Sequence, residues 1–403
     1  MLSTHFCAAV ELRQLVPLFD TSTLKWASQA RLLRWLTLLW VLIGLVILFS
    51  ASYAVGEADF GDGLYYIKRQ LISIIIGLVI FNFVVHSPLQ RILGVAHWFV
   101  LIFLALIFVT LIPGIGTNTN GAARWIAIGS FQLQPSELIK PFLVLQSARV
   151  FGQWQRLKWQ SRLIWLGIFA LVLAGILLQP NLSTTALCGM ALWLVALAAG
   201  LPYIYLIATA MGGVMLAFVS ISINDYQKRR VTTFLNPWAD PLNNGYQLVQ
   251  SLLAIGSGGS WGTGYGLSQQ KLFYLPIQYT DFIFAVFAEE FGFIGCLLFL
   301  FLLVAYGTLA LIVAFKAENA VHRLVAIGAM IFLVGQSLLN IGVASGALPT
   351  TGLPLPLVSY GGNSVLASLL IAGLLIRVAR ESSEAKVVSL PRRSANNGRS
   401  RLV

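Results

Sequence analysis

The chain has 403 residues, of which 58% are hydrophobic and only 10% are charged. Soluble domains carry about 25% charged residues, so this composition excludes a soluble globular protein and indicates an all-α polytopic membrane protein. The formal net charge of +12 comes largely from the termini and from short loops beside apolar segments, which argues against nucleic-acid binding. The cysteines are odd in number and the histidines are scattered, so we expect neither a disulfide framework nor a metal site.

Apolar runs long enough to cross a bilayer predict about ten transmembrane helices. They cover approximately residues 35–55, 69–86, 94–112, 135–151, 163–179, 183–200, 202–223, 282–315, 322–345 and 356–378. The fourth and sixth runs are short and contain polar residues. The chain is thereby divided into a cytoplasmic N-terminal extension (1–34), a ten-helix membrane domain (35–379) and a basic cytoplasmic tail (380–403).

Lysine and arginine positions predict the orientation. With the N-terminus inside, most basic residues fall on the cytoplasmic face, as the positive-inside rule requires, so both termini are expected in the cytoplasm. A minority falls on the outer face against this bias: Lys68, Arg69, Arg124, Lys140, Lys228, Arg229, Arg230 and Lys271. Basic residues in such disfavoured positions indicate a function on the outer face.

The outer face also holds the only long loop, residues 224–280, between the seventh and eighth predicted helices. Its aromatic residues and glycines are typical of an ordered loop that folds onto the membrane surface. The glycine run 256–266 could expose backbone N–H groups to an anion, but it matches neither a Walker motif nor a dinucleotide-binding motif. As evidence for phosphate binding the run is weak.

Three carboxylates enter the apolar run after this loop: Asp281, Glu289 and Glu290. Charges at this depth are costly, and two explanations remain open. Asp281 could simply cap the helix while the glutamates pair with Lys140 or Lys271, or the group could form a functional site. Because the run is longer than a bilayer requires and contains Gly292, we expect residues 281–291 to line a wet cavity.

Two further outer-face stretches contain polar residues. In QPSELIK (134–140), Glu137 and Lys140 are three residues apart, so they share a helix face and can pair. Such a pair could serve the site or only fix helix packing. In LPLPLVSYGGNS (353–364), Ser359 could support the local backbone or close helix packing.

Taken together, these blocks resemble the SEDS family (shape, elongation, division and sporulation). The matching residues are Gly245-Tyr-Gln247, Gln270-Lys271, Thr280-Asp-Phe282, Glu289-Glu290-x-Gly292, Arg124-Trp-Ile126, the QPSExxK block and Leu357-Val-Ser-Tyr-Gly-Gly362. The resemblance covers about residues 34–380 and is closer to the cell-division branch than to the elongation branch. Two blocks differ from the family pattern: QPNLS (179–183) lacks an aspartate and a glycine, and YGGNS (360–364) has asparagine where serine is usual.

The resemblance implies an enzyme that polymerises peptidoglycan glycan strands from lipid II at the outer face of the cytoplasmic (inner) membrane. It implies as partners a class B penicillin-binding transpeptidase and other division-complex membrane proteins, with enrichment at the septum. The family's essential carboxylate is the aspartate of the Thr-Asp-Phe block, here Asp281. Its conserved Glu and Lys of the QPSExxK block correspond to Glu137 and Lys140.

The chemistry then has one base and a set of cations. We expect Asp281 to deprotonate the attacking sugar hydroxyl, with inversion at the anomeric carbon. The leaving polyprenyl pyrophosphate needs positive charge, which basic residues of the outer face can supply. A divalent cation, Mg²⁺ or Mn²⁺, could act together with them. These residues are Arg124, Lys140, Lys228, Arg229, Arg230 and Lys271. Supporting roles are expected for Glu137, Glu289, Glu290, Gln247, Gln270 and Ser359.

Other functions stay open at this point. A lipid II flippase would also have many spans with intramembrane charges, although no clear internal repeat is present and the polar residues concentrate on one face. A non-catalytic scaffold that recruits the transpeptidase, or a role in elongation instead of division, is also compatible with the sequence.

Overall fold

The structure is a computed structural model that describes residues 26–119, 122–129 and 131–388. Most of the predicted N-terminal extension (1–34) and of the basic tail (380–403) lies outside the described residues. The first helix begins at Ser28 and the last ends at Val388, so both extend past the predicted limits of the membrane domain.

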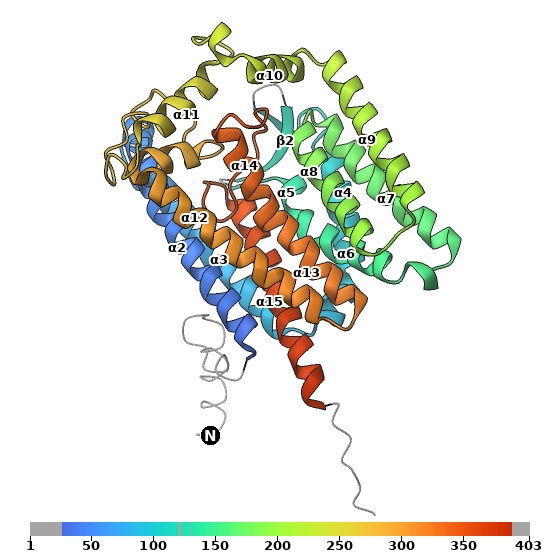
Figure 1. Ribbon diagram of the computed structural model, residues 1–403. Coiled ribbons are helices and arrows are strands. Elements are labelled where there is room, and N and C mark those ends of the chain that lie inside the picture. The colour runs from blue at the N-terminus through green and yellow to red at the C-terminus, as the bar shows by residue number, and fades with distance from the viewer. Residues whose placement is uncertain (1–25, 120–121, 130, 389–403) are drawn as a thin grey trace, which may run out of the picture.

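Long helices form the body of the molecule (Figure 1). Eight stretches among the described residues are long and apolar enough to cross a membrane. They are α2 (Ser28–Phe60), α3 (Tyr65–His86), α4 (Leu89–Val109), α7 (Trp159–Leu178), α9 (Tyr203–Ile223), α12 (Ile283–Lys316), the continuous α13–α14 stretch (Ala320–Ala344) and the part Gly362–Ser382 of α15 (Gly362–Val388). The all-α, multi-pass fold is confirmed.

The fourth and sixth predicted spans are helical but short. The fourth is divided at Ile139 into α5 (Pro135–Leu138) and α6 (Lys140–Gly152), and the sixth is the 17-residue α8 (Leu182–Ala198). Pro141, in the first turn of α6, fits a helix start just after a break. Since most of α6 is buried, it packs as an internal helix rather than as a lipid-facing span.

A small antiparallel sheet, which the sequence did not predict, lies between α4 and α5. Its strands are β1 (Gly116–Thr119), β2 (Ala122–Ile128) and β3 (Phe131–Leu133), in the order β1-β2-β3, with Ile126 opposite Leu133. The Asn-Gly dipeptide at 120–121 was the available signal, because this pair favours tight hairpins.

The long loop 224–280 is ordered, as predicted. It contains α10 (Asp225–Leu235), the 3₁₀ turn Pro237–Ala239 and α11 (Tyr246–Ser257). Figure 1 shows α10 and α11 arching over the end of the bundle that holds β2 and α14. The start of α2 and the end of α15 lie at the opposite end.

Helix α12 is broken at Gly292, where φ is 64°. The glycine-rich segment 258–264 enters this break: Phe293 N–H donates to Gly259 O (2.9 Å), and Thr263 N–H donates to Glu289 O (2.9 Å). The backbone groups freed by the break are therefore satisfied by the glycine-rich segment. Residues 282–290 are buried by protein, so the expectation of a wet cavity along 281–291 is wrong for that part of the segment.

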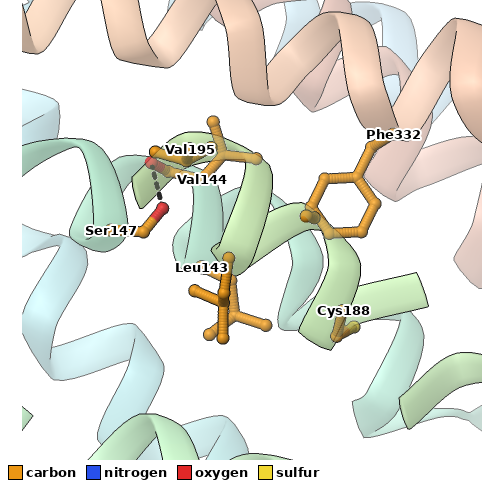
Figure 2. Close-up of a pocket in the computed structure, with 8 residues that line it drawn as sticks. Leu143, Val144, Ser147, Cys188, Val195 and Phe332 are labelled. Atoms are coloured by element: carbon orange, nitrogen blue, oxygen red, sulfur yellow. Dashed lines mark hydrogen bonds between the residues drawn. The ribbon is translucent and has the colours of Figure 1, made fainter. Parts of the chain in front are cut away.

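The α13–α14 stretch contains a π-helical turn, Ile331–Gly335. Figure 2 shows Phe332 of this turn facing a small apolar gap lined by α6 and α8, with Leu143, Ser147 and Cys188 around it. The gap has no room for a water molecule. The extra residue in a π-helical turn changes which side chains face a neighbouring helix, so this turn sets the direction of the polar residues at the start of α14.

Candidate active site

Asp281 lies on a loop that other elements hold from several sides. Asn340 of α14 donates from Nδ2 to Asp281 O and to Leu353 O, both at 2.8 Å. Ser359 Oγ donates to Thr280 O (2.6 Å), and Tyr360 N–H donates to Tyr279 O (2.9 Å). The segments 279–281 and 353–360 are thus fixed to each other beside the start of α12.

Asp281 is not a helix cap. Helix α12 begins at Ile283, its N-cap residue is Phe282, and no side chain makes a capping hydrogen bond there. The capping explanation for this carboxylate is therefore wrong. The side chain is partly buried and is not used to stabilise the helix terminus.

The Asp281 carboxylate and the Arg230 guanidinium of α10 meet at Gly352. A Cβ placed on Gly352 would lie 3.4 Å from Asp281 Oδ2 and 3.7 Å from Arg230 Nη2. Gly352 has φ +73°, so both its conformation and the space around it favour glycine. Arg230 is oriented by Nη1 donation to Thr350 O (3.3 Å) and Thr351 O (3.1 Å). The long loop 224–280 thereby brings a cation to the carboxylate.

Opposing effects act on the ionisation of this carboxylate. Burial raises the pKa of Asp281, and the guanidinium groups of Arg230 and Arg124 act against that rise. The carboxylate of Glu137 raises the same pKa further. Asp281 is therefore a stronger base than an exposed aspartate, with cations close enough to favour its charged form.

The β-sheet supplies Arg124. This side chain, on β2, donates from Nε to Gln179 O (3.1 Å) and from Nη2 to Pro180 O (2.6 Å). The carbonyls belong to the junction between α7 and α8, so the sheet, this junction and the Asp281 loop converge at one end of the bundle. The departure from the family pattern at 179–183 lies at this junction: Asn181 caps α8 by accepting from Thr184 N–H (3.3 Å).

Glu137 and Lys140 form the predicted pair, with Lys140 Nζ 2.6 Å from Glu137 Oε1. Both are buried, and Lys140 Nζ also donates to Gln336 Oε1 (3.1 Å). Gln336 in turn donates to Pro354 O (2.8 Å). The pair is therefore linked to the segment that holds Asp281, and it acts on the site through that segment.

Gln336 and Asn340 were not among the residues predicted from the sequence. They lie four residues apart on α14, directly after the π-helical turn, and both are buried. The available signal was the presence of two amides at helical spacing inside an apolar span, where polar side chains are costly unless they have partners.

Lys271 belongs to a second, separate cluster. Its Nζ lies 2.7 Å from Glu290 Oε1 and 2.8 Å from Ser50 Oγ of α2, and both charged groups are buried. The pairing considered for Glu290 is thus confirmed with Lys271 as the partner. Glu289 instead accepts from Ser268 Oγ and from the N–H groups of Gln269 (3.0 Å) and Gln270 (3.3 Å). These carboxylates fix the loop 268–271 against α12 and α2.

The remaining candidates are dispersed. Lys228 and Arg229 are exposed on α10, next to Arg230. Gln247 donates to Pro276 O (3.2 Å), while Gln270 takes part through its backbone. Within the described residues, no group of three or more His, Cys, Asp or Glu could hold a metal ion.

Asn340→Ala is expected to destabilise the Asp281 loop by roughly 1–3 kcal/mol, since two buried carbonyls would lose their donor. Hydrogen exchange of the amides of residues 279–281, 353 and 355 in detergent should accelerate in this variant. Ser345→Ala, at the end of the same helix and exposed, is the control and should leave exchange unchanged. Equal exchange in Asn340→Ala and in the unmodified protein would contradict the view that Asn340 holds these two loops together.

Comparisons with known proteins identify the family of the chain. A family model described as cell cycle protein, covering FtsW, RodA and SpoVE, matches residues 30–384. The protein named probable peptidoglycan glycosyltransferase FtsW of Synechocystis sp. is 60% identical over 96% of this chain and 98% of its own length. Stage V sporulation protein E of Bacillus subtilis is 35% identical over 89% of this chain and 99% of its own.

Solved structures give the same result. A chain from a peptidoglycan synthase complex, studied for the coordination of polymerization and crosslinking, aligns with a TM-score of 0.70 and 29% identity over 87% of this chain and 97% of its own. The rod shape determining protein RodA of Thermus thermophilus aligns with a TM-score of 0.63 and 27% identity over 87% of this chain and 96% of its own. The resemblance to the SEDS family, closer to its division branch, is confirmed. With one family model matching from the start of α2 almost to the end of α15, the chain belongs to the FtsW, RodA and SpoVE family of cell cycle proteins.

Proposed function

We propose that this chain is a peptidoglycan glycosyltransferase that polymerises lipid II into glycan strands. The observation that carries the proposal is the Asp281 carboxylate, which has no capping role and has the Arg230 guanidinium beside it. It lies on a loop whose backbone is held by Asn340. The names of the relatives, up to 60% identical to this chain, support the same activity.

In the proposed mechanism Asp281 is the general base. It takes the proton from an acceptor sugar hydroxyl while that oxygen attacks the anomeric carbon from the face opposite the leaving group, so the anomeric centre inverts. The raised pKa of the carboxyl makes it a stronger base than an exposed aspartate. The C–O bond to the polyprenyl pyrophosphate breaks, and the pyrophosphate departs with the bonding electrons.

Cations stabilise the departing pyrophosphate. Arg230 and Arg124 are proposed for this task because both act electrostatically on Asp281. The exposed Lys228 and Arg229 of α10 extend the positive surface outward. The buried, paired Lys140 and Lys271 are proposed to position the surrounding loops instead of binding pyrophosphate directly.

The proposed setting is the cytoplasmic membrane, with both termini in the cytoplasm and Asp281 at the outer face. The positive-inside bias supports this orientation. Under this proposal the membrane domain comprises about residues 35–379, flanked by two cytoplasmic extensions.

A division role, at the septum and together with a class B penicillin-binding transpeptidase and other division-complex proteins, is proposed on two grounds. The relatives of 50–60% identity are named FtsW, and the fold resembles a chain from a peptidoglycan synthase complex.

The test is polymerisation of purified lipid II by the purified chain together with its transpeptidase partner. Glycan strands should form, and their formation should depend on Asp281. Lipid II crossing in proteoliposomes that survives Asp281→Asn, without any glycan formation by the unmodified chain, would instead support a flippase. Assembly with partners but no glycan from the unmodified chain would support a scaffold.

Arg230→Gln is expected to shift the acid limb of the pH–rate profile to higher pH. The Arg230 guanidinium lowers the pKa of Asp281, so its removal raises that pKa. A base with a higher pKa is protonated, and hence inactive, already at higher pH. Lipid II polymerisation measured from acid to neutral pH tests this, with the exposed neighbour Arg229→Gln as control. A downward shift, or equal shifts in both variants, would contradict the pairing.

A further inference from the structure

An aromatic cluster lies beside the Asp281 loop and has no part in the mechanism above. It consists of Phe60 at the end of α2, Tyr65 and Tyr66 at the start of α3, and Tyr279 and Tyr360 in the two clamped loops. Phe60 and Tyr65 stack with ring centroids 3.7 Å apart, and Tyr66 lies 4.4 Å from Tyr279 and 5.0 Å from Tyr360. Four separate segments thus build one aromatic surface.

The cluster is continuous with the catalytic loop. Tyr66 and Tyr279 share a hydrogen bond between their hydroxyls (3.1 Å), and Tyr360 N–H bonds Tyr279 O. Tyr279 precedes Asp281 by two residues, so their Cα atoms are at most about 7 Å apart. This distance is shorter than a disaccharide, so a sugar chain whose hydroxyl lies at Asp281 is long enough to reach these rings.

Polar groups border the rings. The Arg69 guanidinium lies 4.8 Å from the centroid of the Tyr65 ring. Burial raises the pKa of Tyr360, and the charge of Arg69 acts against that rise. Asp59 is exposed, and its charge raises the pKa of Tyr279, whose largest shift comes from burial. The side chain of Phe60 is 50% exposed at the edge of the cluster. An accessible ring with a carboxylate and a guanidinium beside it can bind an uncharged polyol.

We propose that this aromatic cluster binds the sugar rings of the glycan strand. The C–H face of a pyranose packs on an aromatic ring, while hydroxyls at its rim exchange hydrogen bonds with Arg69 and Asp59. Pyrophosphate, in contrast, requires the cations Arg230 and Arg124, which come from α10 and β2. The inference rests on the proposed function, and it divides the substrate between an aromatic subsite for sugar and a cationic subsite for phosphate.

An ordinary interfacial aromatic belt explains the cluster less well. Residues of an interfacial belt lie at the level of the lipid headgroups, with their polar ends toward water. Here Tyr66 is only 7% exposed, and its hydroxyl bonds a tyrosine of the catalytic loop. The polar end of Tyr66, which in a belt would face water, is directed inward, toward the Asp281 loop.

Phe60→Ala tests the subsite in the lipid II assay with the transpeptidase partner present. The KM for lipid II should rise roughly two- to tenfold and the glycan product should shorten, since one stacking contact is lost in ground and transition states alike. The acid limb of the pH profile should not move. Phe60→Tyr keeps the ring and should retain the KM of the unmodified chain. Tyr203→Ala, which removes a ring 75% exposed on α9, is the matched control.

Binding of a soluble N-acetylglucosamine tetramer, followed by saturation-transfer NMR, tests the same subsite without catalysis. The unmodified chain, Phe60→Tyr and Asp281→Asn should show transfer, and Phe60→Ala should lose most of it. Unchanged KM, product length and transfer in Phe60→Ala would overturn the subsite. Loss of transpeptidase association in Phe60→Ala, with tetramer binding intact, would overturn it in favour of a protein-docking surface. If the unmodified chain forms no glycan, the proposed function fails, and the tetramer experiment still decides on the subsite.

Discussion

Replacing Asp281 by asparagine is expected to lower glycan polymerisation roughly 10²–10⁴-fold, the usual contribution of a general base. Asparagine has almost the same shape but cannot accept the proton from the attacking hydroxyl. The loop should keep its position, because Asn340 bonds the backbone carbonyl of residue 281 and not its side chain. The measurement is the initial rate of lipid II polymerisation by the purified variant with its transpeptidase partner.

The matched control is Asp225→Asn. Asp225 is exposed in the first turn of α10, the helix that also carries Arg230. This variant loses one negative charge from the same face and should keep the full rate. Association with the transpeptidase and thermal unfolding in detergent should be unchanged in both variants. A full rate in Asp281→Asn would remove the base assignment, and an equal loss in both variants would point to a general effect of charge.

The sequence predicted the membrane helices well, and it singled out Asp281 as a candidate for related physical reasons. Hydropathy identifies spans because an unpaired polar backbone or side chain is costly in lipid, and the same cost makes Asp281 conspicuous at the mouth of α12. The spacing of Glu137 and Lys140 predicted their pair because residues three apart on a helix are neighbours. All of these inferences depend on local patterns.

Tertiary contacts explain what was missed. Gln336 faces Lys140 after a π-helical turn, which a 3.6-residue periodicity does not show. For Lys271 the sequence left open whether it pairs with a glutamate or binds pyrophosphate, because its further neighbour Ser50 lies on α2, distant in sequence. The glycines of 258–264 were weighed as an anion-binding run, yet two N–H groups of this segment are used by α12: Thr263 on Glu289 O and Gly264 on Glu290 O.

The insertion of that glycine-rich segment into α12 leads to the largest expected effect on stability. Gly262→Ala is expected to destabilise the protein by roughly 3–5 kcal/mol, because overpacking costs about 1–3 kcal/mol and each buried backbone group left unpaired adds about 1–3 kcal/mol. An alanine Cβ at this position would lie 2.1 Å from Glu290 O, a backbone atom, and Gly262 has φ +82°. The segment would have to withdraw from the break and give up its bonds to α12. The measurement is the free energy of unfolding in detergent.

Two other glycines separate the contributions to this effect. Gly266 has φ +80° but open space at its Cβ position, so Gly266→Ala measures the cost of backbone conformation alone, about 1–2 kcal/mol. Gly256 lies within α11 with open space around it, so Gly256→Ala should be neutral or stabilising by up to about 1 kcal/mol. Since Glu289 and Glu290 lie directly before the break, Gly262→Ala should also loosen the Lys271–Glu290 pair and the loop that leads to Asp281. If the two variants Gly262→Ala and Gly266→Ala had equal free energies of unfolding, the glycine-rich segment would not need the close backbone contact at Glu290.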